Sequence, residues 1–295
     1  MGTVAVSTAG ETVSVTYGTA AAPPWVGAYH GGPTTDSDFT AKVAKPYMAS
    51  TYYQPTQASL NVPAETARIK SGIRPLITTT LKSGPITLVD VANLTTSGQQ
   101  FLAAQVAAFK SLSEVDPAIE VYGTLDHEFE VKLNQGMITG VDCATYARAL
   151  SNWMAAIKTG APKVVRVWWY GGSDFAHIDI IGKALTVRPD AITYDPYLTD
   201  SHPASETFEG SVKPHLDQLR GASWYDGQPV FLSETACATS KGDDVCAAWL
   251  TNLPAKLAAL GLAGAVYFNR DNPDYLITQG TYPKAVAALT ASMKG

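Results

Sequence analysis

Four residues that could act on a substrate end the stretch Tyr122-Gly-Thr-Leu-Asp-His-Glu-Phe-Glu130. These residues are Asp126, His127, Glu128 and Glu130, and they follow directly after an apolar run. A buried strand that stops at acidic residues brings them to the edge of a sheet, where a substrate can reach them. The stretch therefore predicts a reactive site built around one or more carboxylates. We expect Asp126 to be structural.

A second apolar run, Phe231-Leu-Ser-Glu234, also ends in a carboxylate. Glycoside hydrolysis needs two carboxyl groups beside the scissile bond, and in retaining enzymes they are about 5–5.5 Å apart. One group donates a proton, and the other attacks as an ionised nucleophile. Glu128 and Glu234 are candidates for these two roles. Each could instead be a salt-bridged residue at the rim.

The rest of the chain predicts the elements that position these residues. Eight β-prone runs alternate with segments of helical spacing, which indicates a closed parallel (β/α)8 barrel over residues 22–295. The runs are Trp25–Tyr29, Tyr47–Tyr53, Arg74–Thr79, Ile119–Leu125, Val164–Tyr170, Ala191–Tyr194, Val230–Ser233 and Ala263–Phe268. The helical segments are Asp38–Ala44, Pro63–Lys70, Ser97–Leu112, Cys143–Lys158, Phe175–Leu185, Ser205–Arg220, Asp243–Leu260 and Tyr282–Met293.

Two further features concern the fold. Residues 1–21 predict an N-terminal extension or lead-in strand, with alternation over Thr12–Tyr17. A doubly wound open sheet is the alternative to a barrel, but no glycine-rich phosphate loop follows the first run.

The active site of such a barrel lies at the carboxyl ends of its strands. Aromatic rings and polar edges suit a sugar, because its C–H face packs on a ring and its hydroxyls need donors and acceptors. On this basis we expect a polysaccharide to contact Tyr29, His30, His127, Trp168, Trp169, Tyr197, Tyr267 and Asn269. Which of Trp168 and Trp169 points inward is left open.

The motifs resemble glycoside hydrolase family 26, a family of retaining barrel hydrolases that includes β-mannanases. Asp126-His127-Glu128 and Phe231–Glu234 are similar to its signatures on the fourth and seventh strands. Ala191–Tyr197 and Val266–Tyr275 are similar to its sixth- and eighth-strand segments. The resemblance implies that Glu128 is the acid/base, Glu234 the nucleophile, His127 a subsite residue and Tyr197 a partner of Glu234.

One segment departs from the family. Phe129-Glu130-Val-Lys-Leu-Asn134 stands where family mannanases carry Met-Asn-Gly and a tryptophan-bearing loop, which puts a mannan preference in doubt. Glu130 is a rival for the acid role, because alternate residues of an extended strand point to the same side.

Other classes of function fit less well. A metal hydrolase using Asp126, His127, Glu128 and Glu130 lacks a second histidine at a useful spacing. A serine hydrolase lacks a Gly-x-Ser-x-Gly elbow. The alternative outside enzymes is a carbohydrate-binding adhesin on the same scaffold. We expect no metal and no cofactor.

Composition limits the partners of this chain of 295 residues. A net charge of −5 without basic runs argues against nucleic acid, and no window has the ~18 apolar residues of a membrane helix. Three buried thiols are the simplest expectation for the cysteines, although Cys237 and Cys246 could pair in an oxidising setting. We expect a monomeric module that works outside the cell or on a virion, without a signal peptide in this sequence.

Overall fold

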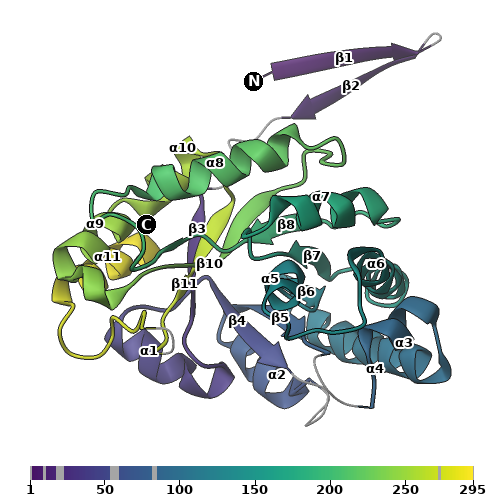
Figure 1. Cartoon of the computed structure of the whole chain (residues 1–295), viewed down its shortest axis with the longest axis horizontal. Helices are drawn as coiled ribbons and strands as arrows, with labels where there is room; N and C mark the ends of the chain where they lie inside the picture. Colours follow the sequence, from purple (N-terminus) through teal and green to yellow (C-terminus); the bar gives the residue numbers. More distant parts are fainter. Residues whose placement is uncertain are drawn as a thin grey trace.

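Eight parallel strands close into a barrel in the computed structural model of the chain, with helices around them (Figure 1). The order β11-β3-β4-β5-β6-β7-β8-β10 becomes a ring because β11 also pairs with β10. The strands are β3 (Trp25–Tyr29), β4 (Met48–Tyr53), β5 (Arg74–Thr79), β6 (Tyr122–Leu125), β7 (Val165–Trp169), β8 (Ala191–Tyr194), β10 (Val230–Cys237) and β11 (Gly264–Phe268). The predicted (β/α)8 barrel is confirmed, and each predicted run overlaps one of its strands, although β10 continues beyond the run Val230–Ser233 to Cys237.

The structure describes residues 2–8, 11–17, 23–53, 60–81, 85–271 and 274–294. Within these ranges β1 (Gly2–Thr8) pairs antiparallel with β2 (Glu11–Tyr17) in a two-stranded sheet of their own. The strand predicted over Thr12–Tyr17 is therefore present as β2. Residues 1, 9, 10 and 18–21 of the predicted N-terminal extension lie outside the described ranges. None of the helices in the described ranges is both long and apolar enough to cross a membrane.

The helices between the strands mostly match the predicted segments. They are α1 (Asp36–Lys42), α2 (Val62–Lys70), α3 (Leu88–Asn93), α4 (Thr96–Ser113), α5 (Phe129–Asn134), α6 (Cys143–Gly160), α7 (Phe175–Ala184), α8 (Phe208–Gly221), α9 (Asp243–Leu250), α10 (Leu253–Ala259) and α11 (Pro283–Lys294). Short 3-10 turns η1 (Pro33–Thr35) and η2 (Thr239–Lys241) and a two-residue strand β9 (Tyr197–Leu198) complete the list.

Three helical elements differ from the prediction. The segment predicted as one helix over Asp243–Leu260 is two, α9 and α10, because Asn252 adopts φ 56° and Pro254 in the first turn of α10 has no N–H to continue the ladder. Helices α3 and α5 were not predicted. Each has six residues, too few to show a helical period.

A glycine lets two helices approach the strand that carries the candidate site. A Cβ on Gly123 of β6 would lie 2.6 Å from Phe109 of α4 and 3.1 Å from Trp153 of α6. Both aromatic rings are fully buried and pack edge to face, with centroids 5.6 Å apart. The absence of a side chain at Gly123 therefore sets how closely α4 and α6 cover β6.

The expectation of three buried thiols was wrong for two of the cysteines. Cys237 at the end of β10 forms a disulfide with Cys246 of α9. Their Cα atoms are 5.3 Å apart, because α9 turns back over the end of β10. Cys143 remains a buried free thiol.

Candidate active site

Glu234 lies on β10, the seventh strand of the barrel, and its side chain is almost fully buried. The hydroxyl of Tyr52 donates to its Oε1, and the hydroxyl of Tyr197 donates to its Oε2. Burial raises the pKa of both tyrosines well above the usual value, with the Glu234 charge as the next cause, so both hydroxyls stay protonated donors. A carboxyl group that receives a hydrogen bond on each oxygen is set up to hold negative charge.

Opposing effects act on the proton of Glu234. Burial raises its pKa to about 8, and the negative charge of Glu128 acts in the same direction. The hydrogen bonds from Tyr197 and Tyr52 and the charge of Lys132 lower it. Glu128 is therefore close enough for the two carboxyl groups to affect each other, and a proton on Glu128 removes one of the two causes of the rise.

Glu128 sits at a sharp turn between β6 and α5. The backbone φ angles are 51° at Glu128 and 52° at Asp126. The N–H of Glu128 donates to Trp169 O over 3.1 Å. The turn is held by Lys132 of α5, whose ammonium is buried and bonds both Asp126 Oδ1 and His127 O. With its side chain 26% exposed, Glu128 is more open to solvent than Glu234.

His127 lies within this cluster. Its ring stacks on Tyr52 with centroids 4.8 Å apart, and it lies 4.9 Å from Trp169. Its Nδ1 is 3.2 Å from Thr78 Oγ1, and its Nε2 is 3.8 Å from Glu128 Oε2. These contacts fix the ring beside Glu128.

Asp195, at the end of β8, is a third carboxylate of the cluster. Its Oδ2 accepts from Trp169 Nε1 at 2.7 Å, and its Oδ1 accepts from Ser233 Oγ at 2.6 Å. Burial raises its pKa well above the usual value, and the charges of Glu234 and Glu128 add to the rise. Asp195 fixes the Trp169 indole, so Trp169 is the member of the tryptophan pair that faces the barrel interior.

Aromatic rings line the cluster on the side of β3 and β11. Tyr29 stacks on Tyr52 with centroids 4.4 Å apart and on Phe268 with centroids 5.1 Å apart. Arg270, just after β11, donates to the Tyr29 hydroxyl over 3.0 Å. Tyr275 stacks on Tyr197 at 5.0 Å. The rings and the guanidinium thus form one continuous wall beside Glu234.

Four of the residues expected to contact a sugar have other partners. Trp168 packs outside the barrel against Trp224, with centroids 5.1 Å apart. His30 stacks on Phe39 and lies 3.3 Å from Asp36, and burial lowers its pKa to about 4. These placements follow from the strand period, because neighbouring residues point to opposite faces.

The other two come from the end of the eighth strand. Tyr267 is fully buried and donates to the backbone oxygen of Tyr275 over 3.3 Å. Asn269 is buried and donates to Thr278 Oγ1 over 2.9 Å.

Glu130 does not have the surroundings that the sequence predicts. The segment is not an extended strand, because α5 begins at Phe129. The Glu130 side chain is fully buried, and its Oε1 accepts from the N–H groups of Gly171 and Gly172 at 2.6 and 2.8 Å. It therefore binds the loop after β7.

Sequence reasoning did not select Tyr52, Asp195, Lys132 or Arg270. The runs Tyr52-Tyr53 and Tyr194-Asp195-Pro196-Tyr197 at strand ends were the available signal for the first two. Lys132 and Arg270 carried no such signal, since their place depends on how α5 and the last loop fold back. No group of three or more His, Cys, Asp or Glu side chains in the described ranges is arranged to hold a metal ion.

Comparisons with known proteins find similar folds among solved structures. No protein-family model matches the chain, and no curated protein matches it in sequence. Several solved structures do match it over most of its length. The fold is similar to that of mannanase-type glycoside hydrolases.

Three of these structures show the extent of the likeness. An exo-β-1,4-mannosidase from Opitutaceae bacterium strain TAV5 matches 92% of this chain with TM-score 0.66 and 11% identity, and this chain spans only 59% of its length. The catalytic domain of a GH26 endo-β-1,4-mannanase from Bacillus sp. JAMB-750 matches 92% of this chain and 86% of its own, with TM-score 0.65 and 12% identity.

A β-mannanase from a symbiotic protist of the termite Reticulitermes speratus, complexed with gluco-manno-oligosaccharide, gives TM-score 0.57 and 15% identity over 92% of this chain and 87% of its own. At such identities the likeness establishes the barrel and leaves the reaction and the substrate open.

Proposed function

We propose that this chain is a retaining glycoside hydrolase that cleaves within a polysaccharide, with Glu234 as nucleophile and Glu128 as acid/base. The observation that carries the proposal is the contrast between the two carboxyl groups. Glu234 is buried and receives a hydroxyl donor on each oxygen, whereas Glu128 is partly exposed at the neighbouring turn. A nucleophile needs a stabilised negative charge, and a proton donor needs access to the leaving group.

The reaction proceeds in two displacements. Ionised Glu234 attacks the anomeric carbon, while Glu128 gives its proton to the departing glycosidic oxygen. This forms an ester between Glu234 and the sugar. Glu128 then takes a proton from water, and the resulting hydroxide attacks the anomeric carbon and releases Glu234. Glu128 ends protonated, as it began.

The proposed cycle requires one proton for the two carboxyl groups of Glu128 and Glu234, and their surroundings suit this. With the proton on Glu128, Glu234 is relieved of the charge repulsion that raises its pKa, and the donors Tyr52 and Tyr197 favour its ionised form. Asp195 holds the Trp169 indole, and His127 stacks on Tyr52 beside Glu128. We propose that His127, Tyr29 and Tyr197 shape the sugar subsite, and that Trp169, which is fully buried, supports it by packing against His127.

The comparisons and the charge support the substrate class that we propose. Mannan-degrading enzymes recur among the similar structures, and the cluster holds several carboxylates, so a neutral polysaccharide such as a β-mannan or a bacterial surface glycan is the proposed substrate. The Cys237–Cys246 disulfide supports a site of action outside the cell or on a virion, because disulfides persist in oxidising surroundings.

The test is release of reducing ends from a panel of β-mannan, glucomannan, mixed-linkage glucan, xylan and bacterial wall glycan, with Glu234→Ala as control. NMR of the first product must show the anomeric configuration of the substrate. The Glu128→Gln variant should lose activity on polysaccharide but retain cleavage of a dinitrophenyl glycoside, whose leaving group needs no proton. Binding of glycans without turnover by the unaltered protein would instead favour a carbohydrate-binding adhesin.

A further inference from the structure

Glu130 is a buried acid that the proposed reaction does not use. Its Oε1 accepts two backbone N–H groups, from Gly171 and Gly172, and its Oε2 is buried without a hydrogen-bond partner among the described residues. No ion pair in the described ranges joins Glu130 to a lysine or arginine, since nearby Lys132 is paired with Asp126. An acid kept in such a place has a cost in stability, so its position needs an explanation.

Gly171 brings Glu130 close to Glu128. A Cβ on Gly171 would lie 3.3 Å from Glu128 Oε1 and 3.3 Å from Glu130 Oε1. The two carboxylate oxygens are therefore separated by no more than twice that distance. The N–H of Glu128 also donates to Trp169 O, two residues before Gly171. The loop after β7 thus holds both acids against one short piece of backbone.

Most titratable groups around the pair are acidic or neutral, and the basic ones are Lys132 and His127. Glu130 faces the thiol of Cys143 and the hydroxyl of Tyr146 on α6, and the hydroxyl of Tyr170 after β7. Glu128 faces His127, Glu234, Asp195 and Tyr197. Two carboxyl groups this close do not ionise independently.

We propose, resting on the proposed function, that Glu130 is a positioning residue for the acid: it ties the loop after β7 to α5, and its negative charge keeps the reactive proton on Glu128. Burial raises the pKa of Glu130 to about 7, so its charge develops near neutral pH. As Glu130 ionises, removal of the proton from Glu128 becomes harder. The enzyme therefore keeps its acid form to higher pH than an isolated carboxyl would.

The Glu130→Gln variant tests this. A glutamine has nearly the same shape, its Oε1 can still accept from Gly171 and Gly172, and the charge is gone. We expect the alkaline limb of the kcat/KM profile to move to lower pH by about one pH unit. The matched control is Glu120→Gln, a carboxylate before β6 that bonds Arg74 and Tyr122, and it should leave the limb in place. An unmoved limb in folded Glu130→Gln overturns the proposal.

A second variant and a second measurement separate charge from structure. Glu130→Asp keeps the charge and shortens the side chain, so kcat should fall while the alkaline limb stays near its original pH. Carboxyl ¹³C NMR of protein labelled at its nine glutamates then follows the Glu128 proton directly, with Glu128→Gln used for assignment. Glu128 should titrate at lower pH in Glu130→Gln than in the unaltered protein.

The NMR result also distinguishes two failures. If no glycan is cleaved but the Glu128 titration moves, the proposed function fails and the coupling between the two acids stands. If glycans are cleaved and the titration does not move, the role of Glu130 fails and the proposed function stands.

Discussion

At each end of the barrel, a tyrosine hydroxyl donates a hydrogen bond to a glutamate. The two glutamates differ in how far they are buried. At the carboxyl end, Tyr197 donates to Glu234, which is buried beside other carboxylates. At the amino end, Tyr122 donates to Glu120 over 3.1 Å, and Glu120 is half exposed and lies 3.4 Å from Arg74. Only the carboxyl end holds a glutamate that water does not screen.

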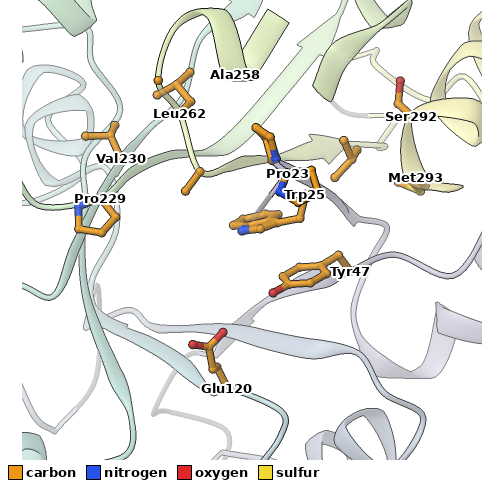
Figure 2. Close-up of a pocket in the computed structure, with 14 residues that line it drawn as sticks. Pro23, Trp25, Tyr47, Glu120, Pro229, Val230, Ala258, Leu262, Ser292 and Met293 are labelled. Atoms are coloured by element: carbon orange, nitrogen blue, oxygen red, sulfur yellow. The ribbon is translucent and has the colours of Figure 1, made fainter. Parts of the chain in front are cut away.

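The amino end also contains a hollow. A cavity of about 840 Å³ opens there, lined mostly by apolar side chains (Figure 2). Trp25 lies over Tyr47 with ring centroids 5.3 Å apart, and Arg74 covers the Tyr47 ring at 4.0 Å. A cavity by itself does not mark a reactive site, whereas buried groups that compete for a proton at the carboxyl ends of the strands favour one. The amino end should therefore matter for stability and the carboxyl end for the reaction.

The largest effect should come from Glu234→Ala. Loss of the nucleophile should lower kcat at least about 10⁴-fold, because no ester can form. Folding should be unimpaired, since the change removes a buried acid. Polysaccharide hydrolysis and thermal melting of the same preparations measure both. Glu120→Ala at the amino end is the control, and equal losses in the two variants would break the comparison.

Trp25→Ala should have the reverse effect: it should lower stability and leave the reaction almost unchanged. Removing a ring that contacts Tyr47 and Phe231 should lower the free energy of unfolding by about 3 kcal/mol. The kcat/KM per folded molecule should stay within about twofold, because the ring lies at the far end of the strands. Urea unfolding and kinetics at a temperature where the variant is folded test this. A loss of kcat without a loss of stability would place part of the reaction at the amino end.

Tyr197→Phe removes one of the two donors to Glu234. Because a hydrogen bond to a charged group contributes about 1.5–3 kcal/mol, kcat should fall roughly 10- to 100-fold. The lost bond also no longer lowers the pKa of Glu234, so the acid limb of the kcat/KM profile should move to higher pH. Tyr122→Phe, which removes the matching hydroxyl from Glu120, should change neither quantity.

The smallest expected effect concerns how the free energy of unfolding depends on pH. Burial raises the pKa of Glu130 to about 7 and that of Glu234 to about 8. Between the usual carboxyl pKa of about 4.3 and these values the folded state binds more protons than the unfolded state. These two acids should therefore lower the free energy of unfolding as pH rises through this window, by at most about 1.4 kcal/mol per pH unit for each acid, and their effect should level off above it. His30 and His215, whose pKa values burial lowers to about 4, act in the opposite direction below about pH 6.5.

Urea midpoints from pH 5 to pH 9 measure this slope. Glu130→Gln should flatten it, and Glu120→Gln at the amino end should leave it unchanged. The same pH dependence in Glu130→Gln and in the unaltered protein would contradict the raised pKa of Glu130.

The sequence by itself determined the barrel and the placement of its two central acids. Each barrel strand is a local apolar run between turns, so the eight strands of the barrel could be predicted without knowing their neighbours. Glu128 and Glu234 follow such runs, and the end of a parallel strand is a position in the sequence as well as in space.

Only the tertiary structure decided what surrounds these acids. Tyr52 reaches Glu234 across 182 residues of sequence, and no local pattern contains that contact. The choice between Trp168 and Trp169 depends on which face of β7 turns inward, which barrel closure settles. Glu130 is buried and accepts hydrogen bonds from the loop after β7 because α5 begins one residue after Glu128. A helix of six residues is too short to show a helical period in the sequence. Local propensity places elements, whereas side-chain partners are set by long-range packing that brings distant residues into one low-dielectric space.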